Sequence, residues 1–190
     1  MSKPLLICAL ATALTACGGQ TEKTAIPRTD ANGDLRYGGL VFKPCALGGD
    51  HGDSVEAQCA TLQAPENHDA PKAQKISLAV AMIPAKSQIQ SDPVVIIAGG
   101  PGQSMLDSYP MLHPALNDVR RNRNILLMDA RGTGASHLLQ CDEIVSLGEN
   151  ADDSDDPAKL RVLTERCRDR LAKTSDLRFY ATADHIRDLD

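Results

Sequence analysis

Aromatic side chains are scarce in this sequence: its 190 residues include three Tyr, two Phe and no Trp, 3% in all. An excess of basic charge is also missing, because 20 Lys and Arg face 25 Asp and Glu, for a formal net charge of -5. This balance argues against a nucleic-acid-binding protein, which needs a basic surface to meet the phosphates. Hydrophobic residues still make up 42% of the chain, which excludes wholesale disorder and suffices for the core of one domain.

No apolar run is long enough to cross a bilayer, which takes about 20 residues. The apolar residues 5–14 follow Lys3 and have the length and the positive start of a signal peptide. They lead into Leu-Thr-Ala-Cys-Gly at residues 14–18, which resembles the lipoprotein box of bacteria, in which the cysteine receives the lipid. We predict a signal peptide over residues 1–16 and a membrane anchor at Cys17, in the cell envelope and in the outer membrane where the host has one. A plain secretory signal, with Cys17 incidental, is the alternative.

Cysteine and histidine spacing offers no zinc motif, because the sequence has no CxxC and its five histidines lack ligand spacing. Loss of one cysteine with the signal peptide and acylation of Cys17 would leave four cysteines in an oxidising compartment. Four cysteines allow three pairings. We favour pairing of sequence neighbours, Cys45 with Cys59 and Cys141 with Cys167, over buried free thiols.

The rest of the sequence predicts a tether followed by one α/β domain. Residues 17–35 are polar and include three glycines and Pro27, as is typical of a linker, and residues 36–190 would form the domain. Short strands are expected at residues 36–41 and 59–64. Apolar residues alternate over residues 75–83, which predicts a strand with one buried face.

A strand–helix–strand pattern follows. The continuous apolar runs 94–98 and 125–128 are typical of strands buried on both faces. Between them a helix is predicted to begin after Ser104, with Asp107 three residues on as a candidate capping box. Such a βαβ unit predicts a mostly parallel sheet with flanking helices.

Two more helices are expected near the end of the sequence. Residues 150–156 are strongly acidic and predict a solvated loop, since they lack the spacing of a calcium-binding loop. Asp156 and Pro157 are suited to be the N-cap and first residue of a helix. A second helix is predicted to begin at Thr182.

The loop after the first apolar run, Ala-Gly-Gly-Pro-Gly-Gln-Ser at residues 98–104, is the first candidate site. Because glycine has no side chain, backbone N–H groups in such a loop can come close to a ligand, and the start of a helix favours an anion there. The Lys-Ser/Thr of a P-loop is missing and GxGxxG does not fit, so a phosphate site is disfavoured. An oxyanion hole is the better interpretation.

A second motif, Met-Asp-Ala-Arg-Gly-Thr-Gly-Ala-Ser at residues 128–136, follows the next apolar run. Together the two motifs closely resemble the GGPG and DxRGxGxS motifs of the proline iminopeptidase and tripeptidyl aminopeptidase branch of α/β-hydrolase serine peptidases. The resemblance runs from about Cys45 to the last residue. It implies the N-terminal portion of an α/β-hydrolase fold, a peptide substrate, and serine chemistry without metal or cofactor. Ala98 stands where many relatives have a histidine, which leaves the backbone donors unchanged.

The resemblance also implies roles for single residues. Gly100, with Gly99 beside it, would supply a backbone N–H of the oxyanion hole. Asp129 and Arg131 are expected to brace the strand end and the turn rather than take part in the chemistry. The other positions of the two motifs are expected to be structural: Pro101, Gly102, Gly132, Gly134 and Ser136.

The nucleophile is missing from these 190 residues. Acyl transfer in this fold needs a serine on a GxSxG elbow, then an acid, then a histidine, and no GxSxG is present. Ser136 beside His137 is a poor dyad, because neighbouring side chains of an extended segment point to opposite sides. We therefore expect an elbow beyond Asp190, and a chain that is an inactive first part of an exported aminopeptidase. An esterase-like hydrolase and a non-catalytic binding lipoprotein are the alternatives.

Overall fold

The computed structural model of the chain describes residues 28–29, 34–48, 54–87, 91–100, 102–142, 144 and 156–189. Several predictions concern residues outside this set. They are the signal peptide with the lipid anchor at Cys17, the turn residue Pro101, and the acidic loop up to residue 155. None of the described helices is long and apolar enough to cross a membrane.

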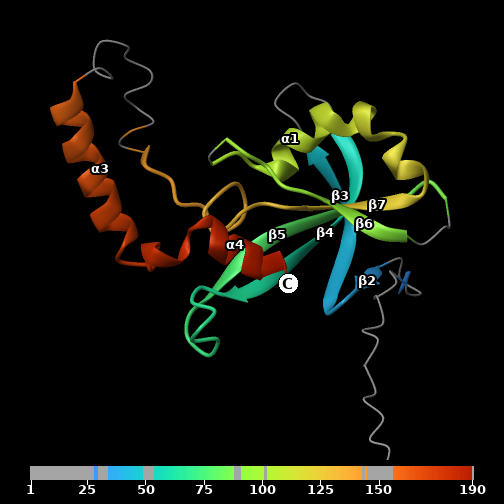
Figure 1. Cartoon of the computed structure of the whole chain (residues 1–190), viewed down its shortest axis with the longest axis horizontal. Helices are drawn as coiled ribbons and strands as arrows, with labels where there is room; N and C mark the ends of the chain where they lie inside the picture. Colours follow the sequence, from blue (N-terminus) through green and yellow to red (C-terminus); the bar gives the residue numbers. More distant parts are fainter. Residues whose placement is uncertain are drawn as a thin grey trace, which may run out of the picture.

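One mixed sheet forms the body of the described structure, with its strands in the order β1-β2-β3-β4-β5-β7-β6 (Figure 1). Two residues of the predicted tether, Arg28 and Thr29, pair with β2 as a short first strand. The strand predicted at residues 36–41 is divided by a turn at Gly38 and Gly39 into the end of β2 and the start of β3, and the φ of 57° at Gly38 favours this reversal. The strand predicted at residues 59–64 is part of the longer strand β4. The strands are β1 Arg28–Thr29, β2 Leu35–Tyr37, β3 Leu40–Gly48, β4 Ser54–Pro65, β5 Lys75–Ile83, β6 Ser91–Ile96 and β7 Arg123–Met128.

The predicted βαβ unit is present, but the sheet around it is not parallel. β6 and β7 run parallel, with Val94 opposite Ile125, and α1 (Met105–Leu112) lies in the connection between them. All other pairs of described strands are antiparallel. The expectation of a mostly parallel sheet is therefore wrong for the described strands. Short reversals join β3 to β4 and β4 to β5, whereas a parallel crossover needs a dozen or more residues.

Apolar side chains cover both faces of the sheet. On one face Tyr109 and Met105 of α1 pack over Ile83 and Ile125. On the other face Phe42 joins a second buried cluster, against which the segment around α4 packs. β5 belongs to both clusters, so its C-terminal half is buried on both sides and the prediction of a single buried face holds only for its first half. Figure 1 shows α1 and α4 on opposite sides of the sheet.

The helices begin where the sequence predicts. The Ser104 side chain accepts a hydrogen bond from the backbone N–H of Asp107 at the start of α1. Asp156 caps α3 (Pro157–Leu171) in the same way, and α4 spans Thr182–Leu189. Short 3₁₀ turns lie at His113–Leu116, Val119–Arg121 and Leu177–Phe179.

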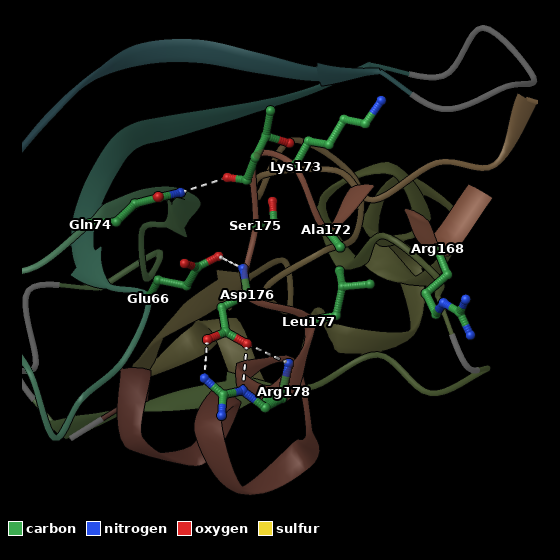
Figure 2. A pocket seen from close by; sticks show the side chains of 10 residues that line it. Glu66, Gln74, Arg168, Ala172, Lys173, Ser175, Asp176, Leu177 and Arg178 are labelled. Carbon is green, nitrogen blue, oxygen red and sulfur yellow. Dashed lines mark hydrogen bonds and ion pairs between the residues drawn. The ribbon is translucent and has the colours of Figure 1, made fainter. Parts of the chain in front are cut away.

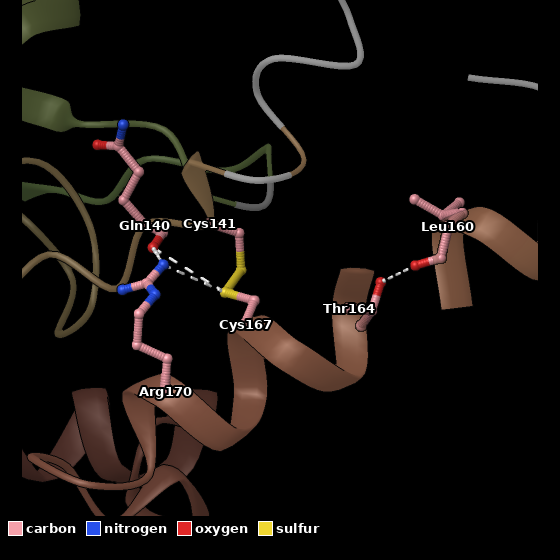
Figure 3. The surroundings of a disulfide bond; sticks show 6 residues. All are labelled: Gln140, Cys141, Leu160, Thr164, Cys167 and Arg170. Carbon is pink, nitrogen blue, oxygen red and sulfur yellow. Dashed lines mark hydrogen bonds between the residues drawn. A yellow bond between two sulfur atoms is a disulfide. The ribbon is translucent and has the colours of Figure 1, made fainter. Parts of the chain in front are cut away.

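Both predicted disulfides are present. Cys45–Cys59 links the neighbouring strands β3 and β4, and Cys141–Cys167 joins α3 to the segment after β7 (Figure 3). Cys167 is the buried residue of α3, and Arg170 adds a hydrogen bond of 2.9 Å to the carbonyl of Gln140. The Cys141–Cys167 bond is therefore the main attachment of α3 to the rest of the described structure.

Candidate active site

The glycine loop and the second motif meet at one pocket of about 340 Å³. The loop leaves the carboxyl end of β6, with Gly100 at φ 120° and Gly102 at φ 91°, both in the region that favours glycine. The start of α4 closes the pocket from the other side. Its lining residues are Ile97, Ala98, Gly99, Gly100, Gly102, Gln103, Ala130, Arg131, Thr133, Tyr180, Ala181, Thr182 and His185.

Asp129, at the end of β7, holds the start of α1 in place. Its Oδ1 accepts hydrogen bonds from the backbone N–H groups of Met105 at 2.7 Å and Leu106 at 3.0 Å. Its Oδ2 accepts from the N–H of Ala135 at 3.1 Å, and the Ser104 hydroxyl donates to the same carboxylate. A buried carboxylate at a helix N-terminus is favourable because these N–H groups have no partner within the helix. Asp129 thereby fixes the glycine loop relative to the second motif.

Gly134 is the position of the second motif where a side chain has no room. Its φ is 48°, and a Cβ there would overlap the Asp129 carboxylate and lie 2.8 Å from the Ser104 Cβ. We expect Gly134→Ala to lower the free energy of unfolding by about 2 kcal/mol through strain and crowding, as measured by urea denaturation. Gly99→Ala is the matched control, since nothing lies within 4 Å of its added Cβ. Equal effects of the two substitutions would contradict the close approach at Gly134.

Arg131 joins three segments behind the pocket. Its side chain is buried, and its guanidinium donates to the carbonyls of Glu66 at 2.7 Å, Phe179 at 2.6 Å and Pro65 at 3.2 Å. It also pairs with the buried carboxylate of Asp188, with Nε 2.8 Å from Oδ2. The end of β4, the turn before α4 and α4 itself are thus tied to the second motif.

Ser136 and His137 do not form a dyad. Ser136 is fully buried, and its hydroxyl accepts a hydrogen bond of 2.8 Å from the N–H of Ala79 in β5. His137 lies 3.0 Å from the Ser175 hydroxyl and stacks on the Tyr180 ring. Both side chains therefore fix the loop rather than face a substrate.

His185 is a pocket residue that sequence reasoning missed. It lies on α4, lines the pocket, and has a side chain only 7% exposed. Its Nδ1 has no hydrogen-bond partner among the described residues, and the nearest carboxylate oxygen, Oδ2 of Asp188, is 4.0 Å away. Residues 182–190 signal only a helix, and one histidine on a helix gives no sequence signal for a site.

Burial disfavours the charged form of His185. It lowers the pKa of the imidazole below its usual 6.5, an effect that nearby Asp188 opposes and nearby Arg131 reinforces. Burial also lowers the pKa of His113, which is 2.7 Å from the Arg120 guanidinium. Both imidazoles are therefore neutral at neutral pH.

The lowered pKa values of His113 and His185 predict that the folded protein is less stable in acid. The unfolded chain, with histidine pKa values near 6.5, binds more protons than the folded chain below that pH. The free energy of unfolding should therefore decrease as the pH falls from 6.5 toward the lower pKa values that the two histidines have in the folded chain. Above pH 6.5 it should be constant. Urea denaturation across this range tests the sign. The double variant His113→Gln/His185→Gln should show a flatter profile, and an unchanged slope would contradict this origin.

A second hollow, of about 490 Å³, lies between the turn after β4 and the end of α3 (Figure 2). Its polar groups pair with one another: Gln74 donates to the Thr174 carbonyl at 2.8 Å, and Glu66 accepts from the N–H of Asp176 at 3.0 Å. Asp176 also pairs with Arg178 at 2.6 Å. No residue of the two motifs lines this hollow, so we place the candidate site at the other pocket.

The lining of the pocket between the motifs is more apolar than polar and carries no carboxylate. The polar residues of the lining include Gln103, Thr182 and His185, next to the glycines of the loop. The Thr133 hydroxyl donates to the Ala130 carbonyl at 2.8 Å. Among the described residues no cluster of three or more His, Cys, Asp and Glu side chains is placed to hold a metal ion. Such a lining offers no anionic partner to a cation.

Comparison with known proteins relates the chain to hydrolases. No family model matches it. It is 34% identical over 82 residues to a protein of Mycobacterium bovis named as a hydrolase and to carboxylesterase B of Mycobacterium tuberculosis. The match covers 42% of this chain and 16% of each relative, so the chain aligns with a small part of longer proteins. The relationship is therefore one between part of this chain and a segment of proteins that are named as a hydrolase or a carboxylesterase.

Proposed function

We propose that this chain supplies the oxyanion loop of an exported serine hydrolase. The observation that carries the proposal is the meeting of the glycine loop, the second motif and the start of α4 around one pocket. In α/β-hydrolases the loop after an early strand donates one N–H to the oxyanion, and Gly100 follows β6 in the corresponding manner. The nucleophile, acid and histidine would come from parts of the whole protein outside these 190 residues.

The mechanism would be acyl transfer through a covalent intermediate. A serine attacks the substrate carbonyl carbon, and the carbonyl oxygen gains the negative charge. The N–H of Gly100, with Gly99 beside it, donates to that oxygen together with the N–H that follows the nucleophile. The leaving group departs with a proton, and water then releases the acyl group. No metal or cofactor is needed for this sequence of steps.

An aminopeptidase is the finer form of the proposal, supported by the resemblance of the two motifs to those of the proline iminopeptidase and tripeptidyl aminopeptidase branch. Such an enzyme would release residues or short peptides from peptide N-termini. The name carboxylesterase B of the Mycobacterium tuberculosis relative favours an esterase as the second candidate. Both candidates share the oxyanion loop and differ in the substrates that the rest of the protein admits.

The test uses the whole protein that contains these residues. It should react with a fluorophosphonate probe, which labels activated serines, and hydrolyse peptidyl or aminoacyl p-nitroanilides. Hydrolysis of p-nitrophenyl esters alone would select the esterase. Absence of both labelling and hydrolysis would refute the serine hydrolase.

Export and lipid anchoring are a separate part of the proposal. The lipoprotein box supports them, and lipid on Cys17 would hold the enzyme at the membrane of the cell envelope. In the native host the whole protein should incorporate an alkyne-tagged fatty acid and sediment with membranes. Cys17→Ser should abolish the incorporation. A Cys17→Ser protein that still incorporates the label would exclude this cysteine as the anchor.

A further inference from the structure

The two cysteines of the disulfide between α3 and the segment after β7 differ in their exposure to solvent. Cys167 is 0% exposed, whereas Cys141 is partly exposed. Exchange of a disulfide with a thiol begins when a thiolate reaches one of the two sulfur atoms. A thiol from solution cannot reach Cys167, so its attack on this bond is directed to Cys141.

A positive charge lies beside the buried sulfur atom. Nη2 of Arg170, three residues further along α3, is 3.8 Å from Sγ of Cys167, and Figure 3 shows the guanidinium next to the disulfide. The same nitrogen donates a hydrogen bond of 2.9 Å to the Gln140 carbonyl, which fixes the guanidinium there. This carbonyl oxygen is 4.0 Å from Sγ and carries only a partial negative charge, so the guanidinium has the stronger effect. A thiolate at Cys167 would therefore be stabilised.

The charge next to Cys141 has the opposite sign. Asp142 follows Cys141 directly in the sequence, and a carboxylate there disfavours a thiolate on Cys141. In thiol–disulfide exchange the sulfur with the more stable thiolate leaves faster. Exposure and charge therefore agree: Cys141 is the sulfur that is attacked, and Cys167 is the sulfur that leaves.

The other disulfide of the described structure lacks this asymmetry. Cys45 and Cys59 are both partly exposed, and both pack against the apolar cluster beneath α1. They belong to β3 and β4, whose backbone pairing spans both positions. The paired strands keep the two sulfur atoms close after reduction, so this bond re-forms readily. It is therefore an internal reference for the reactivity of Cys141–Cys167.

We propose that Cys141 is a modification site for small thiols, which form a mixed disulfide with it while Cys167 leaves as a thiolate beside Arg170. The attacking thiolate forms a new S–S bond to Sγ of Cys141, and the Cys141–Cys167 bond breaks with its electron pair on Sγ of Cys167. A second thiol can then attack the sulfur of the first, which releases Cys141 as a thiolate and the small thiol as its own disulfide. The small thiol is the reductant in both steps. This inference is independent of the proposed hydrolase activity.

The test uses reduced glutathione as the thiol and the whole protein that contains these residues. After a short incubation at neutral pH, free thiols are blocked with N-ethylmaleimide, and the peptides are mapped by mass spectrometry. Glutathione should be found on Cys141 and the maleimide on Cys167, while the Cys45–Cys59 bond is still intact. Glutathione on Cys167, or reduction of Cys45–Cys59 before Cys141–Cys167, would overturn the inference.

Substitution of Arg170 tests the role of the charge. Arg170→Met should slow formation of the mixed disulfide about threefold, because the leaving thiolate loses its cationic neighbour. Arg170→Lys keeps the charge and should retain most of the native rate. Arg161→Met is the matched control, since it removes a guanidinium of the same helix that pairs with Glu165 instead.

The direction of the change separates charge from structure. Loss of the hydrogen bond between Arg170 and Gln140 would loosen the segment and speed the reaction, so a slower rate in Arg170→Met cannot come from partial unfolding. An unchanged or faster rate in Arg170→Met, or an equal slowing in Arg161→Met, would overturn the inference.

Discussion

Replacing Arg131 with Met is expected to lower the free energy of unfolding by about 5 kcal/mol, the upper end of the cost of breaking a buried ion pair. The substitution leaves the buried Asp188 carboxylate without its guanidinium partner and with only the His68 imidazole, 2.9 Å from Oδ1. It also leaves the carbonyls of Glu66 and Phe179 without the donor that now satisfies them. Urea denaturation followed by circular dichroism measures the loss.

Two further variants separate charge from packing. The double variant Arg131→Met/Asp188→Leu removes both charges, so it should be less destabilised than the sum of the single changes. Arg161→Met breaks the exposed pair with Glu165 on α3 and should change the stability little. Additive losses in the double variant would show that Arg131 and Asp188 act independently.

Replacing Asp129 with Ala is expected to cost about 4 kcal/mol, because several buried donors lose one shared acceptor. The N–H groups of Met105 and Leu106 belong to the first turn of α1 and have no partner within that helix. The Ala135 N–H and the Ser104 hydroxyl lose the same carboxylate. Denaturation measures the change, and hydrogen exchange should locate the loss of protection at the start of α1.

Two substitutions provide the comparison for Asp129. Asp129→Asn keeps the shape but turns one acceptor into a donor that faces an N–H, so it should fall between the native protein and Asp129→Ala. Asp107→Ala removes another acidic side chain near the same helix end, an exposed one, and should cost well under half as much. If Asp107→Ala were as costly as Asp129→Ala, the effect would come from the helix dipole rather than from the shared acceptor.

Sequence-local features of the fold could be predicted because their causes are local. The caps at Ser104 and Asp156 are decided by three or four neighbouring residues, and the βαβ unit by two apolar runs with a glycine loop between them. Both disulfides join cysteines that are close in the sequence, with separations of 14 and 26 residues. In each case the partners are close enough in the sequence that only a short stretch of chain has to close between them.

The direction of the other strands and part of the site could not be predicted in this way. A continuous apolar run shows that a strand is buried on both faces, but it does not say whether its neighbours run parallel to it. The partners of Arg131 lie 48 to 66 residues away along the chain, so only the folded sheet brings them together. His185 reaches the pocket because Asp188, one turn further along α4, is fixed by Arg131.

The attachment of α3 depends on whether its disulfide bond is oxidised or reduced. The helix contributes one buried residue to the described structure, and the sulfur of that residue is the bond to Cys141. Limited proteolysis with and without a reductant should therefore cleave near α3 much faster in the reduced protein, whereas equal rates would show that packing suffices to hold the helix. Under reducing conditions α3 would therefore lose its attachment, and under oxidising conditions the disulfide would hold it, so that the position of this helix depends on the redox conditions around the protein.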